Sequence, residues 1–221
     1  MKEHSDELPA VEIFQRGPLL IKKTLLAEHD YDDDYGHTWS GSHIEIELIQ
    51  GLQRRALSSL IPSGWILCES SASEESKVPN GFCTEPGDPR KEIHLDAEIH
   101  LGEEQTEPLL QQDFSLMLLF HEIGHAWSID AMTPLQIEDF QEMKRMQIKQ
   151  ELRTERYKDL VFRYVWEEES KAWSHALGIR KDLETEGIDS EPRMTMTEIH
   201  TKIHSSLGSY RTSLRKIGIT V

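Results

Sequence analysis

The sequence predicts an α+β fold, with a small sheet in its first half and several helices in its second half. Residues 92–101 alternate strictly between apolar and polar side chains, which is the period of a half-buried strand. From Leu109 onward the chain instead looks helical, with apolar side chains that recur every three or four residues. A chain of 221 residues with 37% hydrophobic and 29% charged residues fits one sizeable globular domain.

Residues 1–42 include an acidic run, DYDDDYG, and are predicted to form an irregular acidic segment in front of a single domain over residues 43–221. Apolar side chains at helical spacing predict a helix over residues 44–61. A Pro-Ser-Gly sequence ends that helix, and a short strand is predicted over residues 65–68. Residues 69–90 are rich in Ser, Glu, Pro and Gly and are predicted to form a loop or a hairpin.

The strand predicted over residues 92–101 has two different faces. Its apolar residues are expected to face the core. Its polar residues are expected to form a solvated face that protects a sheet edge, and these residues are His94, Asp96, Glu98 and His100. A second metal site on this polar face is a weaker alternative.

The C-terminal part is predicted to be helical over about residues 133–216, after a first helix for which Asp113 is a candidate N-cap. Thr133, Pro134 and Gln136 occupy the cap, first-turn and capping-box positions of a new helix. The helices of this part are predicted over residues 135–153, 156–182 and 196–216.

The motif His121-Glu122-Ile123-Gly124-His125 lies in an otherwise apolar helix. Because residues i and i+4 share a helix face, the two histidines can bind one metal ion through their ring nitrogens. Glu122 then lies beside the metal, where it can accept a proton from an activated water. Gly124 is expected to clear space between the histidines. The alternatives are a coincidental motif in a core helix and a structural zinc site without chemistry.

A zinc site with an open position needs a third protein ligand. The metzincin spacing requires a histidine at position 131, where this chain has Ala131. Cys83 is an upstream alternative, as in peptide deformylases, although its neighbours do not match that family's motif. Glu169 is favoured because it lies on the apolar stripe of its predicted helix. The adjacent Glu167 and Glu168 fall off that stripe and are predicted to be solvated.

The segment HEIGHAW, followed about 45 residues later by Glu169-Ser170-Lys171-Ala172-Trp173, resembles the gluzincin metallopeptidases. The closest pattern is that of the small intracellular ImmA/IrrE-like group, and the resemblance covers about residues 90–180. It implies that His121, His125 and Glu169 bind zinc and that Glu122 is the general base.

The same resemblance implies a zincin-like core, with a small mixed sheet and the HExxH helix beneath it. It also implies that the strand over residues 92–101 pairs with an extended substrate at the sheet edge. Two positions depart from the family pattern. Trp173 stands where many gluzincins have an aspartate that orients a ligand histidine, and His175 stands where an aromatic residue is common.

Charge and composition exclude some classes of partner. The formal net charge of −16 disfavours nucleic-acid binding, and the sequence has no long apolar run that could cross a membrane. Two cysteines, Cys68 and Cys83, are too few for a disulfide framework, and free thiols are favoured although one bridge is possible. A cytoplasmic location is therefore predicted. The oligomeric state stays open.

These observations together predict a zinc metallopeptidase that acts on a peptide or protein substrate, with Glu122 as the catalytic base. The alternatives are a catalytically silent zinc-binding interaction domain and a zinc amidohydrolase that acts on a non-protein amide or a modified peptide. A donor that stabilises the oxyanion is also needed. The candidates are His200, His204, Tyr164, Tyr210 and Arg211, among which the sequence does not choose.

Overall fold

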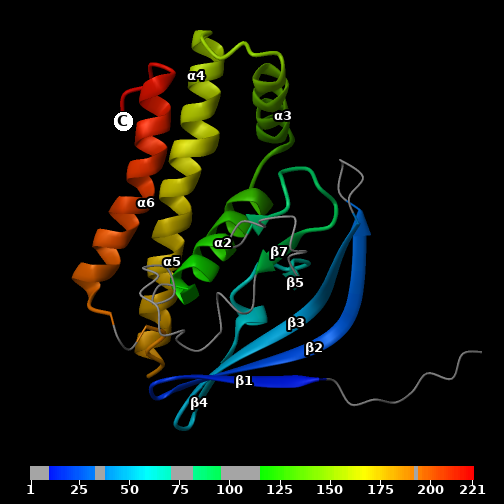
Figure 1. Cartoon of the computed structure of the whole chain (residues 1–221), viewed down its shortest axis with the longest axis vertical. Coiled ribbons are helices and arrows are strands. Elements are labelled where there is room, and N and C mark those ends of the chain that lie inside the picture. Colours follow the sequence, from blue (N-terminus) through cyan, green and yellow to red (C-terminus); the bar gives the residue numbers. More distant parts are fainter. Residues whose placement is uncertain (1–9, 33–37, 71–81, 96–114, 192–193) are drawn as a thin grey trace, which may run out of the picture.

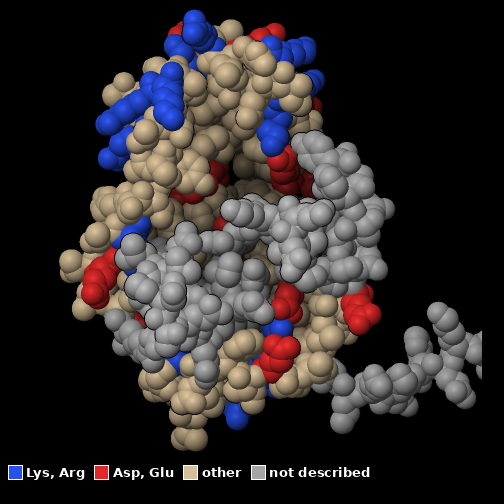
Figure 2. All heavy atoms as spheres, viewed as in Figure 1, with Lys and Arg blue, Asp and Glu red and all other residues tan. Residues whose placement is uncertain are grey.

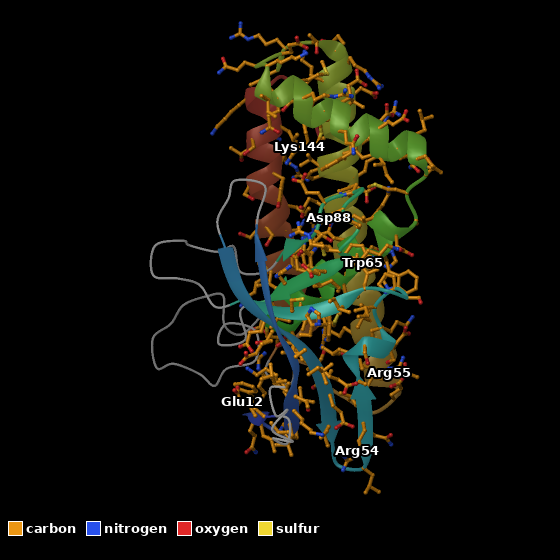
Figure 3. All side chains as sticks on the ribbon, turned by 90° about the vertical axis from the view of Figure 1, so that its right-hand side faces the viewer. Glu12, Arg54, Arg55, Trp65, Asp88 and Lys144 are labelled. Carbon is orange, nitrogen blue, oxygen red and sulfur yellow. The ribbon has the colours of Figure 1, made fainter. Side chains whose placement is uncertain are left out.

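The computed structural model describes residues 10–32, 38–70, 82–95, 115–191 and 194–221. It has the predicted α+β architecture, with a sheet built by the first half of the chain and a helical second half (Figure 1). The sheet lies at one end of the molecule, and the helices extend away from it. Figure 3 shows the same division from the side, with Arg54 near the sheet end and Lys144 near the helical end.

The strands form one mixed sheet in the order β1-β2-β3-β5-β7-β6, with β4 also paired to β3. Within the described residues, β5 and β7 are parallel and the other pairs are antiparallel. The strands are β1 (Val11–Arg16), β2 (Leu19–Asp32), β3 (Thr38–Gln50), β4 (Gln53–Ala56), β5 (Ile66–Ser70), β6 (Phe82–Cys83) and β7 (Glu92–Leu95).

The second half contains α-helices joined by short connections, with one π-helical segment in the middle. The α-helices are α2 (Ser115–Asp130), α3 (Pro134–Ile148), α4 (Glu155–Val161), α5 (Glu168–Thr185) and α6 (Met196–Lys216). The π-helical segment, η3 (Phe162–Glu167), links α4 to α5. The capping box predicted at Thr133 and Gln136 is confirmed at the start of α3. None of the described helices is long and apolar enough to span a membrane.

Two predictions for the first half are wrong. Residues 1–42 are not irregular throughout, because residues 11–32 form β1 and β2, while residues 1–9 and 33–37 lie outside the described part. The helix predicted over residues 44–61 is instead most of β3, a hairpin to β4 and a short 3-10 turn, η1 (Leu57–Ser59). The chain reverses at Gly51, whose φ of 60° suits a residue without a side chain.

The short strand predicted over residues 65–68 corresponds to β5, but the strand predicted over 92–101 needs correction. Only residues 92–95 of it are described, as β7, and β7 is paired on both sides, with β5 and with β6. It is therefore not the edge strand that was expected to receive a substrate. Of the polar residues that were expected to be solvated, only His94 lies in the described part, and it is buried, as is Glu92 on the same face.

One face of the sheet packs against α2 and forms the main core. Ile44, Ile46 and Leu48 of β3 and Ile93 of β7 belong to this core, together with the buried apolar residues of α2. The C-terminal end of α2 is fixed to the sheet by Asp130, which accepts hydrogen bonds from the Trp65 indole and the Lys91 ammonium group. A second, smaller apolar cluster joins α3, α4 and the end of α6.

A distant carboxylate caps the start of α2. Glu191 is buried and accepts a hydrogen bond from the backbone N–H of Met117 at 3.2 Å. The first N–H groups of a helix have no partner within the helix, so this contact satisfies one of them. Burial raises the pKa of Glu191 to about 7, although nearby Arg16 and the Met117 N–H act in the opposite direction.

This pKa predicts a pH-dependent stability. Between the ordinary glutamate pKa of 4.5 and the folded-state pKa of about 7, the folded protein holds a proton on Glu191 that the unfolded chain releases. The contribution of Glu191 to the free energy of unfolding is thus complete below pH 4.5 and is lost as the pH rises through about 7. It amounts to about 3 kcal/mol, at about 1.36 kcal/mol per pKa unit. Glu191→Gln should raise the melting temperature at pH 8 by several degrees and change it little at pH 4.5, and an equal effect at both pH values would contradict this.

Candidate metal centre

Helix α2 presents His121 and His125 on one face, and α5 brings Glu169 against them. The two Nε2 atoms are 3.0 Å apart. The carboxylate of Glu169 lies 3.2 Å from Nε2 of His121 and 3.5 Å from Nε2 of His125. One donor atom from each of these three residues therefore lies within 4.8 Å of the others, and the group could hold a metal ion.

Gly124 allows this convergence, but not in the way that the sequence suggested. A Cβ atom at this position would lie 2.6 Å from the carbonyl oxygen of Ala172 and 2.8 Å from its Cα. These are backbone atoms of α5, so Gly124 clears space for α5 and not for the histidines. The backbones of α2 and α5 touch here, one turn away from Glu169.

The ring of His121 is held by packing. The indole of Trp173 lies against it, with ring centroids 4.2 Å apart and an angle of 32° between the planes. Nδ1 of His121 is buried and has no hydrogen-bond partner among the described residues. The orientation of the His121 ring is therefore fixed by this stacked tryptophan and not by a hydrogen bond to Nδ1 from a described residue.

Glu122 and Cys83 lie together beside the histidines. The Cys83 thiol donates a hydrogen bond to the backbone carbonyl of Glu122 at 2.8 Å, which ties β6 to α2. Burial raises the pKa of the Glu122 carboxyl, against the opposing charges of His125 and His121. Cys83 is not among the three converging residues, and it lies next to Glu122 instead. Neither cysteine is in a disulfide.

The electrostatics of the centre favour a bound cation. Burial alone would raise the pKa of Glu169, but hydrogen bonds from His121 and His125 lower it to about 2. The pKa of His125 is raised, because Glu169 and the charge of Glu122 outweigh the effect of its burial. The centre therefore holds a carboxylate charge that needs positive charge beside it, from protons on the histidines or from a metal ion.

The prediction that Glu168 is solvated is wrong. Its side chain is 13% exposed, Lys171 pairs with one carboxylate oxygen, and the other oxygen is buried without a hydrogen-bond partner among the described residues. The cause is η3, which makes i→i+5 hydrogen bonds and therefore shifts the helical phase that separated Glu168 from Glu169. Both glutamates consequently line the same pocket.

The pocket over the centre has a volume of about 300 Å³. Its walls include His121, Glu122 and His125 of α2, the segment Cys83–Pro86, and side chains from α3, η3, α5 and α6. Figure 2 shows a hollow on this side of the molecule, between the helices labelled α3 and α4 in Figure 1, with acidic side chains on its walls. The centre is therefore accessible from solvent.

Two of the candidate oxyanion donors line this pocket. The Tyr210 hydroxyl interacts with the Glu169 carboxylate, and burial together with that charge raises the pKa of Tyr210. Tyr164 also lines the pocket, with its hydroxyl 3.5 Å from Asp139. His200 and His204 are exposed and are not part of the pocket lining, and the Arg211 guanidinium lies over the Trp166 ring.

Comparisons of the chain with protein-family models, with curated proteins and with solved structures find no match.

Proposed function

We propose that this chain is a zinc-dependent metallopeptidase whose centre is formed by His121, His125 and Glu169. The observation that carries the proposal is the convergence of these three donors at the floor of a pocket, with Glu122 directly beside them. The resemblance of the HExxH and ExxA segments to ImmA/IrrE-like gluzincins supports the same ligand set.

The donor set suits zinc. Ligand bonds of about 2.0–2.2 Å in a tetrahedron place nitrogen and oxygen donors roughly 3.3–3.6 Å apart. The two Nε2 atoms here are 3.0 Å apart, Oε2 of Glu169 lies 3.2 Å from His121 Nε2, and Oε1 of Glu169 lies 3.5 Å from His125 Nε2. Two imidazoles and one carboxylate would give zinc three protein ligands, which is the number found in catalytic zinc sites. Zinc bound here would supply a Lewis acid and lower the pKa of water toward about 7.

The chain's own residues supply the proton transfers. Glu122 is the only glutamate directly next to a histidine ligand in sequence, and its raised pKa suits a group that takes a proton and later returns it. It would accept a proton from the attacking water and deliver it to the leaving amine. Tyr210 of α6 would donate its hydroxyl hydrogen to the developing oxyanion, because it lines the pocket and its hydroxyl reaches the Glu169 carboxylate.

A peptide or protein substrate and a cytoplasmic location belong to this proposal. The open pocket favours a segment of polypeptide, and the two free cysteines favour a reducing compartment. The net charge of −16 argues against nucleic acid as a partner.

Glu169 and Glu168 provide the test of the metal site. Glu169→Ala should lose about one equivalent of zinc and all hydrolysis, because changes outside the ligand set already cost about 10–100-fold in affinity and a lost ligand costs more. Glu168→Ala is the matched control and should keep that zinc, since its carboxylate is paired with Lys171. Zinc would be measured after dialysis against a mild chelator.

The same proteins test the activity. Wild type should cleave unstructured polypeptides, lose this activity on chelation and regain it when zinc is added, whereas Glu169→Ala should not respond to zinc. If the protein cleaved small amides but no polypeptide, the proposed activity would have to change from peptidase to amidohydrolase. Zinc binding without hydrolysis of either substrate class would indicate a silent binding domain, and equal zinc loss in both variants would contradict the proposed ligand set.

Tyr210→Phe tests the oxyanion donor. Removing one such donor costs about 10²–10³-fold in kcat, with little effect on ground-state binding. We therefore expect a loss of this size in kcat, an unchanged zinc content and a similar KM. Tyr164→Phe is the matched control, because Tyr164 lines the same pocket but directs its hydroxyl toward Asp139. Equal losses in the two variants would show that Tyr210 has no special role.

A further inference from the structure

A second group of metal-ligand side chains lies on the face of the sheet that points away from α2. His43 of β3 is directly opposite Cys68 of β5, and Cys68 is in register with His94 of β7. Glu92 precedes His94 by two residues and therefore points to the same side. The residues that alternate with them, such as Ile44 and Ile93, belong to the main core on the other face.

All four of these side chains are polar or ionisable, and three of them are buried, while His43 is partly exposed. Cys68, Glu92 and His94 are 1%, 3% and 1% exposed. Nε2 of His94 lies 3.0 Å from a carboxylate oxygen of Glu92. Donor atoms of His43, Cys68 and Glu92 all lie within 4.8 Å of one another. A glutamate is rarely buried to this degree unless a partner or a metal ion compensates its charge.

We propose that His43, Cys68 and Glu92 bind a second zinc ion, distinct from the one at His121, His125 and Glu169. One nitrogen, one sulfur and one oxygen donor are all ligand types that zinc accepts. His94 is within hydrogen-bond distance of the Glu92 carboxylate and would orient it, as residues next to metal ligands commonly do. On binding, the Cys68 thiol releases its proton to solvent and forms the bond to zinc as a thiolate.

The role that follows from the position is structural. The three ligands come from β3, β5 and β7, which are adjacent in the sheet but up to 49 residues apart in sequence. An ion at this point would fix the register of these strands. It would also support β6, because Cys83 of β6 pairs with Ile93 of β7 and hydrogen-bonds to Glu122. The second ion would thus stabilise the position of Glu122 indirectly, through β7 and β6, and would not contact the substrate.

Cobalt provides a direct test, because a thiolate bound to cobalt(II) gives a charge-transfer absorption that nitrogen and oxygen ligands do not. The chain has only two cysteines, so the sulfur that causes the absorption can be assigned. The metal-free wild-type chain should bind two equivalents of cobalt(II) and show this absorption. Cys68→Ser should bind one equivalent and lose it, whereas Cys83→Ser should keep it.

Glu169→Ala separates this proposal from the proposed function. It should lose one equivalent of cobalt but keep the thiolate absorption, because the second site shares no residue with the first. Glu92→Gln is a second variant in case Cys68→Ser does not fold, and it should weaken cobalt binding at the thiolate site at least about 10-fold. Absence of the absorption in wild type, or its loss in Cys83→Ser but not in Cys68→Ser, would overturn the proposal.

Discussion

Glu122→Gln is expected to reduce kcat by about 10²–10⁴-fold, the usual contribution of a general base or acid, while zinc content and melting temperature stay close to those of wild type. The glutamine side chain has nearly the same shape, so the packing of Glu122 beside Cys83 and the histidines is kept. Its amide cannot accept the proton of the attacking water. The measurement is kcat on a polypeptide substrate at equal zinc occupancy.

Glu85→Gln is the control for this experiment. Glu85 lines the same pocket, but it is exposed and paired with Lys144 at the rim. The same chemical change there should leave most of kcat intact. If Glu122→Gln kept most of its turnover with zinc bound, another group would have to be the base. If it lost zinc as well as activity, the experiment would place Glu122 in the ligand set.

The parts of the fold that the sequence predicted well have local signals. The start of α3 follows from Thr133, Pro134 and Gln136, whose side chains and ring act within one turn. The helix predicted over residues 196–216 coincides with α6. The motif histidines could be placed on one face of a helix from spacing alone, because i and i+4 always share a face.

The prediction for the first half of the chain was wrong because the apolar residues there fit both the two-residue period of a strand and the 3.6-residue period of a helix. Ile44, Ile46 and Leu48 alternate with glutamates and are buried as strand residues. Leu48, Leu52 and Ala56 also fit helical spacing, which led to the wrong prediction of a helix. Leu52 decides the matter, since it is 97% exposed at the hairpin turn that Gly51 makes and contributes to no apolar face.

The centre shows which features sequence reasoning could not reach. The sequence distinguishes Glu169 from its neighbours by the 100° per residue of an ideal α-helix, and η3, which ends at Glu167, departs from that geometry. Glu169 still lies beside the two histidines, but Glu168 is largely buried and not solvated as the ideal helix predicts. The contacts of Cys83 and Trp173 depend on segments that lie far from α2 in sequence, so no local pattern could have identified them.

Gly124→Ala should destabilise the protein and abolish the zinc binding that we propose at His121, His125 and Glu169. Alanine favours a helix by about 1 kcal/mol over glycine, so the change would be mildly stabilising if there were space. Here the new Cβ would lie 2.6 Å and 2.8 Å from backbone atoms of Ala172, which cannot rotate away. Overpacking of this kind costs about 1–3 kcal/mol or more. The helices must therefore separate, and Glu169, one turn before Ala172, moves away from both histidines.

Gly178→Ala is the matched control, because Gly178 lies on α5 and a Cβ there would meet no atom within 4 Å. It should keep its zinc and gain up to about 1 kcal/mol of stability from helix propensity. Melting temperature and zinc content after dialysis would be measured for both variants. For a chain of this size, a loss of about 2 kcal/mol lowers the melting temperature by roughly 4–8 °C. A Gly124→Ala protein with the melting temperature and zinc content of wild type would show that α2 and α5 do not need this contact to bring Glu169 to the histidines.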